Sequence, residues 1–131
     1  MIFSINRYSL DKRFISEGNL TITSEGQRTT LLYADSEIEI KASELYHPLT
    51  ALEGLREILE KEYSSIIACN GCRCDTAYRP TGGYGTYKII LGQQATERLN
   101  LFEPTNEIEK LCTVDQHKAA YKKWVNSLGR N

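Results

Sequence analysis

The sequence predicts an α+β fold, in which an antiparallel sheet packs against two main helices. Short runs rich in Thr, Ile and Leu lie between residues 14 and 41, and turn-forming residues separate them. Two later segments, 48–63 and 113–128, repeat apolar residues at helical spacing. A glycine-rich turn between two apolar runs, after residue 66, adds a later hairpin to the sheet.

The segment 14–41 reads FISEGNLTITSEGQRTTLLYADSEIEIK and has the pattern of an antiparallel meander. We expect turns at Glu17-Gly18, at Glu25-Gly26 and at residues 34–37. Isoleucine and charged residues alternate in EIEIK, residues 37–41, so one face of this strand packs inward and the other meets water.

The segment PLTALEGLREILEKEY, residues 48–63, predicts the first helix. Pro48 suits a first helical position, because the N–H that proline lacks would have no partner there. The apolar stripe of this helix consists of Leu49, Leu52, Leu55, Leu59 and Tyr63.

The second helix is predicted near the end of the printed sequence. Thr113 and Gln116 have the spacing of a capping box, and Gly129 follows as a stop signal. Its apolar stripe consists of Val114, Tyr121, Trp124, Val125 and Leu128.

Length and composition predict a single globular domain over residues 1–131. The chain is 40% apolar and 25% charged, which matches an average folded protein, and it is long enough to bury a core. The start, MIFSINRYSLDKR, lacks the apolar run of a signal peptide, and no window resembles a membrane span. We therefore expect a cytoplasmic protein with reduced cysteines and no membrane association.

Three of the four cysteines lie in ACNGCRCD, residues 68–75, and allow two interpretations. In the first, a turn at Asn70-Gly71 brings Cys69 and Cys72 to one zinc ion, and Cys74, Cys112 or His117 completes the site. This zinc site would belong to a nucleic-acid-binding module.

In the second interpretation, Ile66 to Asp75 form one buried strand, paired with Tyr87 to Leu91, and the site is purely structural. Cys69 and Cys72 then point to opposite faces, remain reduced and bind no metal. Arg73 and Asp75 share a face and form an ion pair. We adopt this interpretation, with no cofactor; its structural residues are Cys69, Asn70, Gly71, Arg73 and Asp75.

No catalytic motif is present in the sequence. The glycines of RPTGGYGTYK, residues 79–88, precede a strand pattern instead of a helix, so they indicate a turn with Tyr84 near its tip and not a phosphate-binding loop. His47 and His117 are the only histidines, and both have plausible structural roles beside helices. An enzyme acting on RNA through these histidines remains an alternative.

Acidic residues are concentrated between Asp35 and Glu62, a segment that contains eight acidic and three basic residues. No part of the chain is basic enough for a dedicated nucleic-acid-binding protein. An acidic segment attracts a basic partner, although it also occurs as ordinary solvated surface.

CNGCRCD, the following glycine-rich turn, GTYKIILGQQA and LNLFEPT resemble small bacterial cytosolic proteins that include immunity proteins of polymorphic or contact-dependent growth-inhibition toxins. The resemblance covers about residues 55–105 and carries over no functional residue. It implies inhibition by binding, without catalysis: the protein would block a cognate toxin domain.

Charge and aromatic character then select the partner-binding candidates, because a toxin that acts on nucleic acid has a basic cleft and tyrosines are frequent interface anchors. Tyr33 also looks exposed in the sequence. The partner-binding candidates are Asp35, Glu37, Glu39, Tyr46, Glu53, Glu57, Glu60 and Tyr84.

Overall fold

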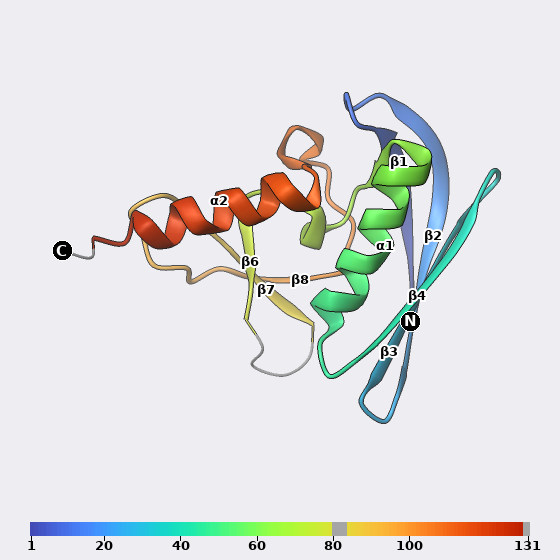
Figure 1. Cartoon of the computed structure of the whole chain (residues 1–131), viewed down its shortest axis with the longest axis horizontal. Coiled ribbons are helices and arrows are strands. Elements are labelled where there is room, and N and C mark those ends of the chain that lie inside the picture. The colour runs from blue at the N-terminus through green and yellow to red at the C-terminus, as the bar shows by residue number, and fades with distance from the viewer. Residues whose placement is uncertain (80–83, 130–131) are drawn as a thin grey trace.

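The computed structural model describes residues 1–79 and 84–129, and these form the α+β arrangement that the sequence predicts. A five-stranded antiparallel sheet and a smaller three-stranded sheet are accompanied by two α-helices (Figure 1). The first sheet contains β1 (Ile2–Ser9), β2 (Phe14–Glu25), β3 (Arg28–Asp35), β4 (Glu39–Leu45) and β5 (Ser65–Ile67). The second contains β6 (Thr76–Tyr78), β7 (Gly85–Lys88) and β8 (Arg98–Asn100). The helices are α1 (Pro48–Tyr63) and α2 (Val114–Asn126), with 3₁₀ turns η1 (Asn70–Cys72) and η2 (Ile108–Lys110).

The five-stranded sheet has the order β4-β3-β2-β1-β5. Strands β2, β3 and β4 form the meander predicted for residues 14–41, and β1 and β5, which were not predicted in this form, extend the sheet on one side. The expected turn at Glu25-Gly26 is present, and Gly26 adopts a positive φ of 60°. The expected turn at Glu17-Gly18 is wrong, because both residues lie inside β2. A Cβ on Gly18 would lie 2.7 Å from Cζ of the Tyr33 ring. Gly18 therefore allows close packing within the sheet and does not form a turn.

Helix α1 covers one face of this sheet, and its predicted bounds are confirmed (Figure 1). Pro48 occupies the start of the helix, and Ser64 ends it in the left-handed conformation. Leu52, Leu55 and Leu59 are completely buried in the main core.

No helix of the described residues is long and apolar enough to cross a membrane.

Helix α2 begins with the predicted capping box, in which Thr113 and Gln116 exchange side-chain and backbone hydrogen bonds. The helix extends away from the five-stranded sheet and lies beside the smaller one (Figure 1). Trp124 is buried in a second, smaller core with Ala77 and Ile89.

The predicted strand from Ile66 to Asp75 is wrong. Only its first residues belong to β5, at the edge of the large sheet beside β1; the chain then turns through η1. The predicted pairing of this segment with Tyr87–Leu91 is also wrong, because the hairpin partner of β7 is β6, with Thr76 opposite Lys88. The turn that we assigned to the glycines of residues 79–88 includes residues 80–83, which lie outside the described residues.

The reason for the turn is the close packing of Gly71. A Cβ on this residue would lie 2.7 Å from Cδ1 of Leu101 and 3.0 Å from its carbonyl oxygen. Gly71 N–H donates to that same carbonyl at 2.8 Å. The Asn70-Gly71 dipeptide thus places the backbone of η1 directly against β8 and the core.

Candidate functional site

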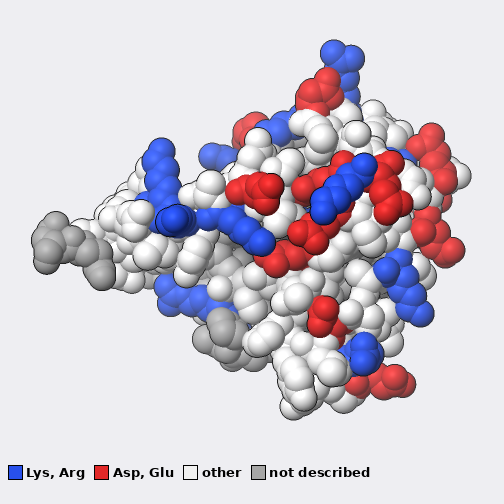
Figure 2. Space-filling view, in the orientation of Figure 1, with Lys and Arg blue, Asp and Glu red and all other residues white. Residues whose placement is uncertain are grey.

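Acidic side chains gather over α1, whereas basic side chains lie over α2 (Figure 2). Glu53, Glu57 and Glu60 follow each other at spacings of four and three residues, so they share one side of α1. Glu57 is exposed, and Glu53 and Glu60 are half-buried. These three glutamates form a continuous row, which we call the α1 acidic row.

The α1 acidic row opposes the local stability of its own helix. Like charges at spacings of three or four residues repel each other by about 0.2–0.5 kcal/mol per pair. Acidic side chains near the C-terminal end of a helix also oppose the helix dipole, and Glu60 and Glu62 lie in the last turn of α1. The opposing favourable contacts are the pair of Glu57 with Lys61 and the charge of the buried Arg56, which lies three residues after Glu53 and four before Glu60.

Glu60 also has a structural contact, because its Oε2 accepts a hydrogen bond of 3.0 Å from the backbone N–H of Val114. Burial raises the pKa of Glu60 above its ordinary value, although this hydrogen bond opposes the shift. Glu60 therefore connects α1 to the first turn of α2 while it belongs to the α1 acidic row.

The candidate Asp35 is not a surface residue, which corrects its sequence assignment. Its side chain has no exposed area and pairs with the buried Arg7 at 2.7 Å. Burial would raise the pKa of Asp35, but hydrogen bonds from Arg7 and from two backbone N–H groups lower it below its ordinary value. Arg7 also pairs with Glu37 at 2.7 Å, and the Glu37 side chain remains 61% exposed.

The remaining acidic candidate, Glu39, is exposed at the start of β4, an edge strand of the large sheet. Tyr46 is 64% exposed and lies between β4 and α1 with a positive φ of 72°. Tyr33, which we expected to be exposed, is fully buried. Tyr84 is half-buried and packs edge-on against Phe102 with a centroid distance of 5.1 Å, so it is not displayed as predicted.

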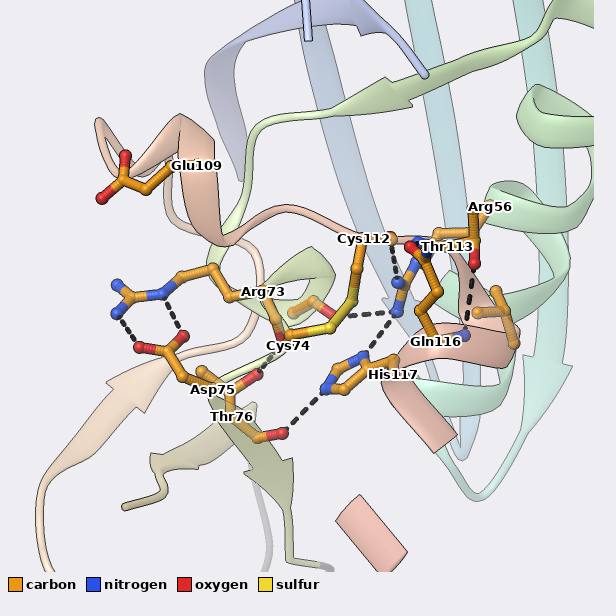
Figure 3. The surroundings of a disulfide bond; sticks show 12 residues. Arg56, Arg73, Cys74, Asp75, Thr76, Glu109, Cys112, Thr113, Gln116 and His117 are labelled. Carbon is orange, nitrogen blue, oxygen red and sulfur yellow. Dashed lines mark hydrogen bonds and ion pairs between the residues drawn. A yellow bond between two sulfur atoms is a disulfide. The ribbon is translucent and has the colours of Figure 1, made fainter. Parts of the chain in front are cut away.

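Two cysteines form a disulfide, which corrects the prediction that all four are reduced. Cys74 and Cys112 are bonded, and 38 positions separate them in the chain (Figure 3). The prediction failed because β-strand geometry was assumed for residues 66–75, whereas the chain turns at η1 and brings Cys74 beside the segment before α2. There Cys74 N–H donates to the carbonyl of Lys110 at 2.8 Å.

Cys69 and Cys72 are buried free thiols, but they do not point to opposite faces as expected. Their sulfur atoms lie 3.5 Å apart, because the 3₁₀ turn between them replaces the predicted strand. The hydrogen bond with Cys72, together with burial, raises the pKa of Cys69 well above its ordinary value. We call these residues the buried thiol pair.

The zinc hypothesis is not supported by these positions. Among residues 1–79 and 84–129, no group of three His, Cys, Asp or Glu side chains is arranged to hold a metal ion. Cys74 and Cys112 are bonded to each other, and both ring nitrogens of His117 have protein partners. The buried thiol pair therefore lacks the third ligand that the hypothesis requires.

Arg56 and His117 form a buried polar cluster that the sequence analysis missed (Figure 3). Arg56 donates to the carbonyls of Gly71 at 3.0 Å and Cys112 at 2.8 Å. It also contacts Nδ1 of His117 at 2.9 Å, while Nε2 of His117 lies 2.7 Å from the carbonyl of Thr76. Since a carbonyl only accepts, Nε2 carries the proton and Nδ1 accepts from Arg56.

Burial and the neighbouring Arg56 charge lower the pKa of His117 to about 4. His117 is therefore neutral near pH 7, and both of its nitrogens are occupied by structural contacts. The alternative of an RNA-acting enzyme would need the proton-accepting nitrogen of His117, and Arg56 contacts that nitrogen in this structure. His47, the other histidine, is exposed at the N-cap of α1 and makes no side-chain capping hydrogen bond.

The predicted ion pair between Arg73 and Asp75 is confirmed, with two hydrogen bonds of 2.8 and 2.7 Å. The pair is not on a strand, since β6 begins only at Thr76. The ion pair lies between η1 and β6 and stiffens this junction. Arg73 also forms an isolated β-bridge with Leu111.

The sequence pattern could have indicated that Arg7 and Arg56 are buried, although the sequence analysis did not select them. Arg7 occupies an inward position in the alternation Phe3, Ile5, Arg7 of β1. Arg56 lies four residues after Leu52, on the apolar stripe of α1.

Comparison with known proteins gives no match to a family model, a curated protein or a solved structure.

Proposed function

We propose that this protein is an immunity-type inhibitor, which binds a cognate toxin domain with a basic cleft and performs no catalysis itself. The α1 acidic row carries this proposal. Its charges reduce the local stability of α1, so a contribution to binding offers a physical reason for their position. A nuclease domain is the expected partner, because its substrate-binding surface must attract phosphate groups.

The proposed contact surface is the outer side of α1, together with Glu37 and Glu39 at the β4 edge and Tyr46 between these elements. Asp35 is withdrawn from the surface because it is buried against Arg7. Arg56 is also buried, so the exposed part of residues 35–62 retains seven acidic and two basic residues. The net charge of the segment that meets solvent is therefore unchanged at −5.

Tyr46 is the proposed aromatic anchor. A positive φ is unfavourable for a residue with a Cβ, and here it holds an exposed aromatic side chain beside an acidic surface. Aromatic side chains supply much of the binding free energy at protein interfaces. Tyr84 is withdrawn because its ring packs on Phe102.

A cytoplasmic location belongs to the same proposal, since the inhibitor would meet its toxin inside the cell. Structural disulfides are uncommon in a reducing cytoplasm. This location therefore requires that the protein also folds and binds when Cys74 and Cys112 are thiols.

The test uses the C-terminal domain of a secreted protein encoded beside this chain. Binding of the purified domains and protection of cells that express the toxin domain are measured for wild type, Tyr46→Ala and Glu57→Lys. Glu97→Lys is the matched control, because Glu97 is an exposed acidic residue before β8 and outside the surface. We expect both surface variants to weaken binding and Glu97→Lys to bind as wild type; absence of binding by wild type contradicts the proposal.

A further inference from the structure

The disulfide lies at the wall of a hollow of about 450 Å³. Both Cys74 and Cys112 line this hollow, which we call the disulfide hollow. Cys74 is only half-buried, whereas Cys69 and Cys72 are fully buried and do not line it. A small molecule in the disulfide hollow therefore meets the disulfide and not the buried thiol pair.

The charged groups of the disulfide hollow have a positive balance. Three lysines line it: Lys12, Lys110 and Lys123. The lining carboxylates are Asp75 and Glu109, and both oxygens of Asp75 accept hydrogen bonds from Arg73. Lys12 is held beside another lining residue, because its Nζ donates to the carbonyl of Glu109 at 2.9 Å.

Most of the remaining wall is apolar and includes Ile89, Leu111 and Trp124, and Gln116 adds a polar side chain. The apolar side chains suit a short carbon chain, while the lysines suit an anionic group at its end. We propose that the disulfide hollow is a thiol–disulfide exchange site for a small anionic thiol.

The exchange is balanced without a further oxidant. The thiolate of the small molecule attacks the sulfur of one half-cystine, the Cys74–Cys112 bond breaks, and the other half-cystine leaves as a thiolate that takes up a proton. A second small thiolate then attacks the mixed disulfide. The protein gains two electrons as a dithiol, and two small thiols are oxidised to their symmetrical disulfide.

The inference is independent of the proposed inhibitor function and is tested with three thiols of similar size. These are 2-mercaptoethanesulfonate, which is anionic, 2-mercaptoethanol, which is neutral, and cysteamine, which is cationic. Each reacts with folded wild-type protein, and the count of free thiols is followed as it rises from two to four. Each rate constant is expressed per thiolate. It is then divided by the rate constant for the reaction of the same thiol with hydroxyethyl disulfide, a small uncharged disulfide, which removes differences in intrinsic reactivity among the thiols.

We expect the anionic thiol to react about tenfold faster than the cationic one, and mass spectrometry to place the mixed disulfide on Cys74 or Cys112. The double variant Lys110→Gln/Lys123→Gln should reduce this preference to less than about twofold. Lys41→Gln/Lys61→Gln removes the same charge outside the disulfide hollow and should retain the preference.

A second measurement on wild type does not depend on the variants: the preference should shrink as salt is raised from about 0.01 to 1 M. Equal rates for the three thiols would overturn the proposal. So would mixed disulfides on Cys69 or Cys72, or a thiol count that stays at two until the protein is denatured.

Discussion

Arg56 and His117 are joined by a hydrogen bond of 2.9 Å across 61 positions of the chain, and the imidazole is the acceptor. The neutral ring is required for this contact, because a protonated Nδ1 would direct its hydrogen at the guanidinium. The same ring donates to Thr76 in β6. One uncharged histidine thus connects α1, α2 and the small sheet.

His117 should make the protein less stable as the pH falls from about 6.5 to about 4. Its pKa is about 4 in the folded protein and 6.5 as its ordinary value. In this window the unfolded chain binds more protons, so acid favours unfolding. The total effect is on the order of 3 kcal/mol. Urea unfolding of wild type and His117→Ala across this window measures it, and the difference between the two should shrink toward low pH.

NMR titration of the His117 ring supplies the direct check, since it needs no variant. The expected signals are those of the neutral ring protonated at Nε2 at pH 6. A ring that titrates near its ordinary pKa of 6.5 would contradict the buried arrangement.

Glycine substitutions at two positions should have opposite effects on stability. Gly71→Ala should destabilise the protein by about 1–3 kcal/mol, because its Cβ would overlap with Leu101 in a packed core. Gly54→Ala should stabilise it by about 0.5–1 kcal/mol, since Gly54 lies inside α1 and the nearest atom to that Cβ beyond the adjoining helix backbone is the Cβ of Ala42, 4.0 Å away. Chemical denaturation of both variants tests the pair, and destabilisation by Gly54→Ala would show that the packing is misassigned.

The helices and the meander could be predicted because their patterns are local. Pro48, the apolar stripe of α1 and the capping box of α2 each act within a few residues. Residues 66–75 could not be predicted in the same way, because an apolar run has the same pattern whether it continues as a strand or turns. The contact between Gly71 and Leu101, 30 positions later, decides the turn, and no local period records it.

The surface candidates failed for a related reason. Asp35 looks solvent-exposed within an acidic segment, and its burial depends on Arg7, which lies 28 positions away. Tyr84 looks like a loop residue, and its position depends on Phe102. By contrast, the glutamates of α1 follow from the helix period, so the α1 acidic row was predictable from sequence.

Loss of the Cys74–Cys112 disulfide should reduce the free energy of unfolding by about 4 kcal/mol. The bond closes a loop of 38 positions, and this value follows from the entropy that such a loop removes from the unfolded chain. Thermal and denaturant unfolding of Cys74→Ala/Cys112→Ala tests it. The matched control is Cys69→Ala, which removes a buried thiol without removing a crosslink. The double variant should still fold, as a cytoplasmic inhibitor requires.

Glu57→Lys should separate binding from stability at the α1 acidic row. In wild type, Glu57 is repelled by Glu53 and Glu60, and its only favourably spaced partner along this side is Lys61. The substitution converts the contacts with both glutamates to attraction and that with Lys61 to repulsion, so the protein should be unchanged or more stable by up to about 0.5 kcal/mol. Its association with a basic toxin domain should nevertheless slow by severalfold, because the local negative potential is reduced.

Stopped-flow association at several salt concentrations measures this effect of Glu57→Lys. Wild-type association should slow as salt rises, and Glu57→Lys should show a weaker salt dependence. An association rate that is independent of salt and of this substitution would exclude the α1 acidic row from the contact.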